Sequence, residues 1–243
     1  MSLTAAKELV HRFLPEAVPK QPTLLLESEV IPCQAAYLGF FGDSHVMVVN
    51  NHPFFGAPQL TKDMHKAHEL VHQAQAENLG EEALFGFRFS DYLSPDELNP
   101  SKPDDFLRKY SHIVHQRNIR LELAGFLLEG MARMGEMMIL ERMARQGNGD
   151  LKRIDILQRE IVAERRSYRR NPTHSFNQPN IPYVVGYRLV RALVRGKPPE
   201  AAIDTLLKVD YTACRRIQFG SSGFDQILKR PSLIPTREAP QAA

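Results

Sequence analysis

The order of apolar and polar residues divides the chain into a strand-like first part and a helical remainder. Three short segments are rich in Val, Leu, Tyr and Phe and are separated by Pro32-Cys33 and Gly42-Asp43: residues 23–31, 34–41 and 45–50. Short apolar runs bounded by turn residues are typical of β-strands. We therefore expect a small sheet over about residues 22–50, with the segment 45–50 as its edge strand.

After this block, apolar residues recur every three or four positions, which is the period of a helix. No Pro or Gly occurs from Thr61 to Leu79. We expect two long helices, over about residues 60–78 and 119–146, and shorter ones around them. The pattern predicts a mostly helical α+β fold with one domain over residues 1–230. The Pro- and Ala-rich end, 231–243, is expected to be a disordered tail.

Composition narrows the class of protein. The chain has 243 residues, 43% of them hydrophobic, and a net charge of only +3, which argues against a dedicated nucleic-acid binder. Two cysteines indicate neither a disulfide framework nor a Cys-rich zinc module. Glu8 and His11 interrupt the apolar part of the N-terminus, so it does not resemble a secretion signal. No apolar run approaches the roughly 20 residues of a membrane span. We expect a cytoplasmic protein without a membrane partner.

The stretch His68-Glu69-Leu70-Val71-His72 has the pattern H-E-x-x-H inside the first long helix. Residues four apart lie on one face of a helix, one turn from each other. Two imidazoles placed in this way can bind one tetrahedral metal ion, most often zinc. The carboxylate of Glu69 then lies beside the attacking water and can accept its proton.

A catalytic zinc site usually has a third protein ligand. Glu129 is the best candidate, because it interrupts an apolar helix face where a carboxylate is costly unless a cation compensates it. The alternative for Glu129 is a solvent-facing side chain or an ion pair with Arg133. Glu136, seven residues further on and near the same face, is a poorer candidate for the ligand.

HELVH followed by Glu129-Gly130-Met131-Ala132 resembles the gluzincins, the thermolysin-like zinc metallopeptidases whose third ligand is a downstream helical Glu. The likeness is closest to uncharacterised predicted zinc-dependent protease families, which also have a short sheet before the motif and a later Tyr-x-x-Gly helix. Here that helix contains Tyr183-Val184-Val185-Gly186. The resemblance implies a zincin-like fold and one zinc ion per chain, held by His68, His72 and Glu129. It also implies Glu69 as general base and a peptide or protein as substrate.

Peptide hydrolysis of this kind needs a hydrogen-bond donor to the developing oxyanion and a surface that binds the substrate. Tyr183 is the first choice for the donor, with His174 and Tyr187 behind it. An edge strand beside the metal-binding helix would add an extended peptide to the sheet. On the expectation that 45–50 is that strand, Val48 and Asn50 are candidate substrate-binding residues.

Two other interpretations remain open. One is a carboxylate-bridged di-metal oxidase, in which Glu69 and His72 form one E-x-x-H pair, Glu8 and His11 another, and Glu122 and Glu129 supply further ligands. The other is a non-catalytic protein that keeps zinc for stability and interaction. The sequence carries no signal for an oligomeric state or for endo- as against exopeptidase action.

Overall fold

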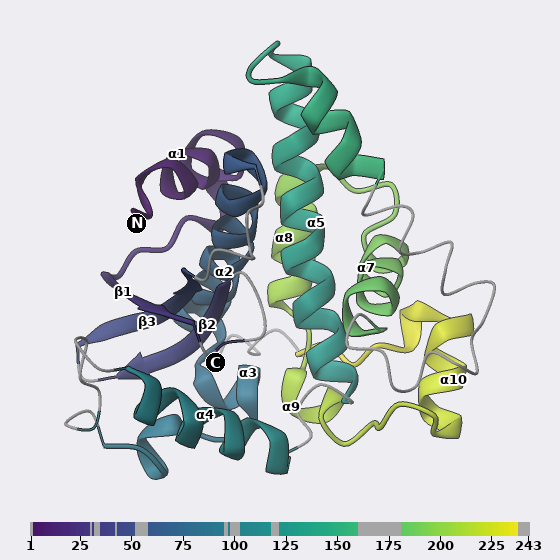
Figure 1. Ribbon diagram of the computed structural model, residues 1–243. Helices are drawn as coiled ribbons and strands as arrows, with labels where there is room; N and C mark the ends of the chain where they lie inside the picture. Colours follow the sequence, from purple (N-terminus) through teal and green to yellow (C-terminus); the bar gives the residue numbers. More distant parts are fainter. Residues whose placement is uncertain are drawn as a thin grey trace, which may run out of the picture.

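The computed structural model describes residues 2–29, 31, 35–41, 43–51, 58–94, 97, 103–117, 122–159 and 181–237. The prediction of a mostly helical α+β fold with a small sheet is confirmed. Helix α5 (Leu123–Arg145) runs through the centre of the molecule, with α2 (Gln59–Leu79) and the sheet on one side and α7 (Ile181–Leu193) on the other (Figure 1). The two long helices begin and end close to the predicted bounds.

The sheet has the strands β1 (Thr23–Ser28), β2 (Ala35–Phe41) and β3 (Ser44–Asn50), in the order β1-β3-β2. Strand β1 pairs with β3 in parallel, and β2 pairs with β3 antiparallel. The prediction that 45–50 is the edge strand is therefore wrong, because β3 lies in the middle. Its residues Val46 to Val49 are all buried, as expected for a strand covered on both faces.

The remaining described elements are short helices around these layers. They are α1 (Thr4–Phe13), η1 (Pro15–Ala17), α3 (Glu81–Phe85), η2 (Phe89–Asp91), α4 (Asp104–Arg117), a helical stretch over residues 151–159, α8 (Pro199–Leu207), α9 (Tyr211–Cys214), α10 (Ser222–Lys229) and η6 (Pro231–Leu233). A large apolar core joins α1, α2, α5, α7 and α8, and a second cluster packs aromatic side chains between the sheet, η2 and α4. No helix of the described ranges is both long enough and apolar enough to cross a membrane.

Helices α5 and α7 approach each other at a pair of glycines. A Cβ atom added to Gly186 would lie 1.8 Å from the carbonyl oxygen of Phe126, and one added to Gly130 would lie 2.2 Å from the carbonyl carbon of Gly186. Any side chain at either position would overlap the backbone of the other helix. Because Gly130 follows Glu129 and Gly186 lies one turn after Tyr183, this contact brings both candidate site residues to one place.

The C-terminal end is ordered further than predicted. The amide of Asp210 donates to the carbonyl of Pro235 at 2.9 Å, and the amide of Arg237 donates to the carbonyl of Lys208 at 2.7 Å. Ile234 is buried in the main core. The expectation of a disordered tail is therefore wrong for residues 231–237, since one apolar side chain anchors a Pro-rich segment. Residues 238–243 lie outside the described ranges.

Candidate metal centre

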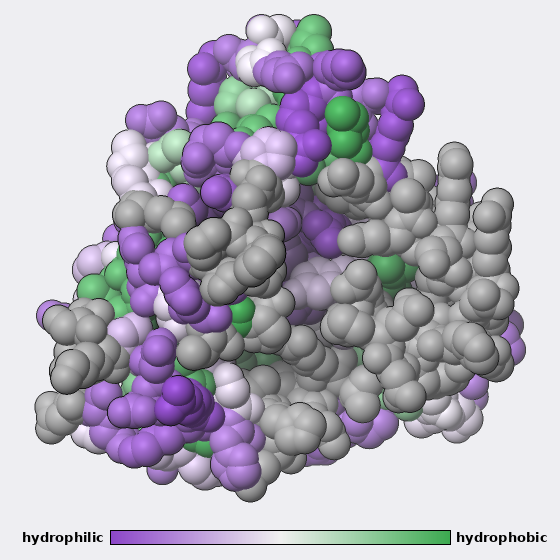
Figure 2. All heavy atoms as spheres, viewed as in Figure 1, coloured by the Kyte–Doolittle hydropathy of each residue, from purple (hydrophilic) through white to green (hydrophobic). Residues whose placement is uncertain are grey.

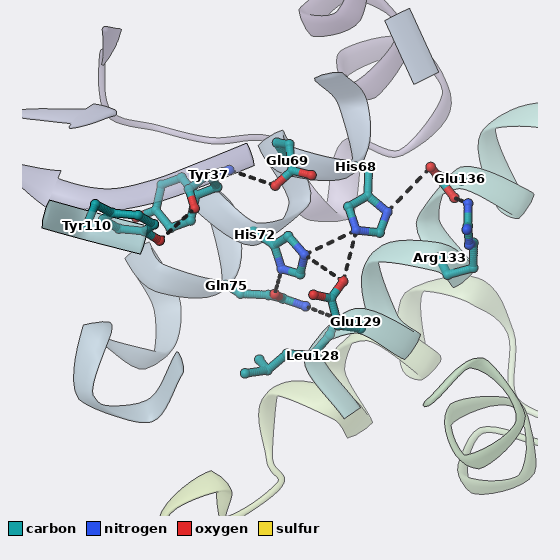
Figure 3. A network of polar contacts seen from close by, with 10 residues as sticks. All are labelled: Tyr37, His68, Glu69, His72, Gln75, Tyr110, Leu128, Glu129, Arg133 and Glu136. Atoms are coloured by element: carbon teal, nitrogen blue, oxygen red, sulfur yellow. Dashed lines mark hydrogen bonds and ion pairs between the residues drawn. The ribbon is translucent and has the colours of Figure 1, made fainter. Parts of the chain in front are cut away.

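Three ligand atoms meet where α2 and α5 face each other (Figure 3). Nε2 of His68 lies 3.2 Å from Nε2 of His72. Oε2 of Glu129 lies 3.2 Å from the first nitrogen and 3.3 Å from the second. The helical spacing of the histidines puts both rings on the side of α2 that faces α5, and Glu129 reaches them from α5. Among the described residues, these three are the one group of His, Cys, Asp or Glu side chains assembled closely enough to hold a metal ion.

The triangle has the size that tetrahedral zinc requires. Zinc binds imidazole nitrogen and carboxylate oxygen at about 2.0–2.1 Å, so two ligand atoms of a regular tetrahedron lie roughly 3.3–3.4 Å apart. All three separations, 3.2, 3.2 and 3.3 Å, are close to this value. A set of two nitrogens and one carboxylate oxygen suits zinc among the common protein metals. The residues therefore fit the ion that the sequence predicts.

The carboxylates determine the protonation of the histidines. Burial disfavours the charged form of His68, but Glu136 and Glu129 outweigh burial and raise the pKa of His68 to about 10. Burial likewise opposes charge on His72, whose pKa is raised by Glu129. Burial would raise the pKa of Glu129, but the two histidines hold that pKa well below its usual range. The partly buried carboxylate of Glu129 is thus stabilised by a cationic partner, and a divalent ion can replace the protons on the rings.

A glutamine orients His72. Nδ1 of His72 lies 2.7 Å from Oε1 of Gln75, whose Nε2 donates to the carbonyl of Leu128 at 3.1 Å. The amide oxygen can only accept, so Nδ1 of His72 carries the proton and Nε2 presents its lone pair to the metal position. Because Leu128 precedes Glu129, the fully buried Gln75 also ties the two ligand-bearing helices together.

A carboxylate and an arginine hold the other ring. Oε1 of Glu136 lies 3.4 Å from Nδ1 of His68, and Oε2 of Glu136 accepts from Arg133 at 2.7 Å. Burial would raise the pKa of Glu136, but Arg133 and His68 lower it to about 2. Glu136, the poorer candidate for the third ligand, therefore contacts the nitrogen of His68 that points away from the site. A carboxylate in this position orients the ring and raises its basicity.

Glu69 lies beside the triangle without belonging to it. Its Oε2 accepts from the amide of Tyr37 in β2 at 2.8 Å. Burial raises the pKa of Glu69, against the lowering effect of His68 and His72. A raised pKa makes a carboxylate a better proton acceptor, which is the property expected of a general base.

A small cavity opens next to these groups. Its volume is about 110 Å³. The described residues that line it are Ala35, His65, His68, Glu69, Arg133, Glu136 and Tyr183. A hollow with hydrophilic residues in its floor lies over α5 on the face of the molecule shown in Figure 2. The candidate base and one metal ligand thus border the same cavity.

The structure separates the candidates for the oxyanion donor. The ring of Tyr183 lies 5.7 Å from the ring of His68, and the guanidinium of Arg133 lies 5.2 Å from the centre of the Tyr183 ring. Tyr187, one turn further along α7, is buried beside Arg191 and is not part of the cavity lining. His174 lies outside the described residues. Of the described candidates, Tyr183 alone borders the cavity.

The residues proposed for substrate binding are not at the site. Asn50 is buried and donates through Nδ2 to the carbonyl of Ile31 at 2.6 Å, and Val48 is buried in the middle strand. Neither belongs to the described lining of the cavity, whereas Ala35 of β2 does. The prediction depended on 45–50 being the edge strand. The edge next to α2 is β2 instead, because β3 pairs with β2 on one side and with β1 on the other and so lies inside the sheet.

Sequence reasoning named Arg133 and Glu136 for other roles and did not name Gln75, so it missed the three side chains that support the histidines. Gln75, Arg133 and Glu136 have no role in the motif itself. A signal was present for two of them, since Gln75 lies three residues after His72 and Glu136 is a second carboxylate in an apolar helix. Arg133 carries no comparable signal, because its ordinary i,i+3 spacing to Glu136 occurs on many exposed helices.

The ligands of a di-metal site are not assembled in the described part of the chain. Glu8 and His11 are exposed on α1. Glu122 pairs with Arg215 at 2.8 Å and is not among the assembled metal ligands. The second E-x-x-H pair and one bridging carboxylate of that interpretation therefore lie elsewhere.

Likeness to known proteins does not assign this site. Comparisons of the chain with protein-family models, with curated proteins and with solved structures found no match. What can support a function is the arrangement itself: a His-His-Glu triangle, the partly buried carboxylate of Glu69 next to it, and a small cavity lined by His68 and Glu69.

Proposed function

We propose that the protein is a zinc-dependent peptidase of the gluzincin type. The observation that carries this proposal is the triangle of His68, His72 and Glu129, with separations of 3.2–3.3 Å, next to the partly buried carboxylate of Glu69. The order of the motifs along the chain supports the same class. A zincin-like fold is part of the proposal, and the small sheet beside the motif helix is consistent with it.

Zinc would supply a Lewis acid that polarises the peptide carbonyl and lowers the pKa of water. The residues of the protein itself would transfer the proton and orient the reacting groups. Glu69 accepts the proton of the attacking water and later passes it to the leaving amine. The bond from the amide of Tyr37 to one oxygen of Glu69 fixes the direction of the carboxylate. Because the amide of Tyr37 binds Oε2, the proposal assigns the role of proton acceptor to Oε1.

Tyr183 is the proposed donor to the oxyanion. Tyr183 on α7 and the general base Glu69 on α2 both border the cavity. The guanidinium over its ring holds the aromatic side chain in place and adds positive potential where negative charge develops. A Tyr183→Phe variant should keep the metal and the fold, while activity falls by roughly one to three powers of ten.

The decisive experiment compares the wild type with Glu69→Gln. Elemental analysis of both proteins should give one zinc per chain, because Glu69 is not a ligand. A mixed peptide library analysed by mass spectrometry should show cleavage by the wild type and a loss of roughly a hundredfold to ten-thousandfold in the variant. Glu82→Gln is the matched control, since Glu82 is a solvent-exposed side chain paired with Arg88.

Two results would overturn the proposal. If Glu69→Gln cleaves as fast as the wild type, Glu69 is not the base. If the zinc-loaded wild type cleaves no member of the library, the site is a zinc-bearing structural or interaction site and not a peptidase centre. Iron at two equivalents per chain would instead favour the di-metal class.

A further inference from the structure

A second cavity lies between α5, α7 and α8, apart from the metal centre. Its volume is about 300 Å³, at the lower end of the range for ligand-binding cavities. Among the described residues, its lining shares no member with the cavity beside Glu69. Helices α5 and α7 touch at Gly130 and Gly186, and this second cavity lies beyond that contact, where large side chains follow the glycines on both helices.

The interior of the second cavity is apolar and adaptable. Met134, Met137 and Met138 lie three and four positions apart on α5, so they share one face of that helix. The other apolar lining residues are Tyr187, Val194 and Ala202. All six are buried except Met138, which is partly buried. Unbranched thioether side chains adjust to ligands of different shape, so this interior suits a flexible hydrocarbon chain.

The solvent-facing side of the same cavity is cationic. Arg191, Arg195 and Lys197 line it, and all three are exposed. Glu141 is the one acid of the described lining, and it has Arg145 as its own partner at 3.9 Å. The partial negative charge at the C-terminal end of α7 offsets only about half a cation. An excess of positive charge therefore remains next to the apolar interior.

These cations are not neutralised by the protein. In the ranges that the structure describes, none of the three forms an ion pair with a carboxylate: the guanidinium of Arg191 lies 5.8 Å from the centre of the Tyr187 ring, and Nζ of Lys197 donates to Oγ1 of Thr205 at 2.7 Å. A guanidinium can bind a carboxylate through two parallel hydrogen bonds. The solvent-facing side thus offers donors to a planar anion.

We propose that this cavity binds a single-chain fatty acid of medium length. Its carboxylate lies at Arg191, Arg195 and Lys197, and its alkyl chain lies against the methionines of α5. An anionic headgroup on one hydrocarbon chain matches both halves of the lining, whereas an acidic peptide without an apolar side chain would leave the interior unfilled. The site is separate from the metal centre, and its ligand does not depend on the proposed peptidase activity.

Calorimetric titration of the full-length protein tests the ligand class. Hexanoate, octanoate and decanoate, each below its micelle-forming concentration, should bind at one site per chain. The affinity should rise about threefold to fourfold for each added methylene until the cavity is full. Decylammonium, with the same chain and the opposite charge, should bind at least about tenfold more weakly. Absence of saturable decanoate binding would overturn the proposal, as would equal affinity for decylammonium or for a tri-glutamate peptide.

Substitutions in the two halves of the lining test the site. Arg195→Gln removes an exposed cation, so it should leave the melting temperature unchanged and weaken decanoate binding by roughly threefold to tenfold. Ala202→Met fills part of the interior and should also weaken binding. Arg108→Gln, at an exposed position of α4, is the control and should bind as the wild type does. If Ala202→Met does not fold, the comparison of Arg195→Gln with Arg108→Gln still decides, and equal affinity of these two variants would refute the proposal.

NMR spectra of protein labelled at the methionine methyl groups locate the bound chain. Decanoate should shift the signals of Met134, Met137 and Met138, each assigned by substitution with Leu. The signal of Met47, which is fully buried in β3, should not move. Shifts confined to methionines outside this cavity would place the ligand elsewhere and contradict the proposed site.

Discussion

Gly186→Ala should loosen the contact that places Tyr183 beside the metal ligands. The new Cβ atom would lie 1.8 Å from the carbonyl oxygen of Phe126. Contacts of this kind are not found below about 3.0 Å, so α7 must move away from α5 by at least about 1.2 Å. The obstacle is the backbone of a long helix, which cannot rotate aside as a side chain does.

The expected magnitudes follow from this displacement. Overpacking a core of this density costs roughly 1–3 kcal/mol. For a chain of this length the melting temperature should then fall by about 2 to 12 °C. A shift of about 1 Å at a catalytic group can lower activity by roughly a hundredfold. Zinc should be retained, because the three ligands lie on α2 and α5 and not on α7.

Gly135→Ala on α5 is the matched control. Its Cβ atom would lie 2.9 Å from Cδ2 of Leu14 and 3.2 Å from Cγ2 of Val71, which are the ends of side chains that can adjust. An alanine is also favoured over glycine in a helix by about 1 kcal/mol. Differential scanning fluorimetry, zinc analysis and the peptide assay should be run on both variants. If Gly186→Ala is as stable and as active as Gly135→Ala, the crossing does not position Tyr183.

Three further predictions concern the metal. His72→Ala should abolish zinc retention in elemental analysis. His112→Ala, at an exposed position of α4, should leave about one zinc per chain. Gln75→Leu, which keeps the volume but loses both hydrogen bonds, should lower zinc affinity by roughly ten- to a hundredfold in a competition titration with a chelator. The stabilisation by zinc should grow with pH from about 6 to 8, because the metal must displace a proton whose pKa on His68 is raised to about 10. That raised pKa stabilises the metal-free fold fully below the ordinary value of about 6.5 and is lost as the pH rises toward 10, so a zinc-induced melting shift that does not change with pH would contradict the electrostatic account.

Local sequence patterns predicted where the helices and strands lie. They predicted less well which of these elements pack against one another. The spacing of His68 and His72 on an uninterrupted helix indicated one shared face, and the structure brings both rings to one point. Glu129 was identified because a carboxylate on an apolar helix needs compensation. That argument depends only on the charge of Glu129 and on the apolar residues around it in the helix, and both can be read from the sequence. It therefore located a residue on a separate helix, more than fifty positions downstream.

The spacing of apolar residues alone did not give the strand order. The segment 45–50 reads as a good strand, but periodicity does not determine which strands flank it. Its unbroken apolar run, with Val46 to Val49 all buried, was the signal that it lies inside the sheet. Overlooking this signal misplaced Val48 and Asn50 as substrate contacts. The tail was mispredicted for a similar reason. Its Pro and Ala content suggested disorder, whereas the single side chain of Ile234 anchors it in the core.

The charges around the cavity give an independent reason to expect a divalent cation. The carboxylate of Glu136 is buried and those of Glu69 and Glu129 are partly buried, and the guanidinium of Arg133 pairs with Glu136. A carboxylate withdrawn from water is disfavoured in its charged form, so the ionised Glu129, which has no guanidinium partner here, needs positive charge from another source. Protons on His68 and His72 can supply it in the metal-free protein, which is why the pKa of each histidine is raised. A zinc ion supplies the same two charges from the centre of the triangle and leaves both imidazoles neutral as ligands.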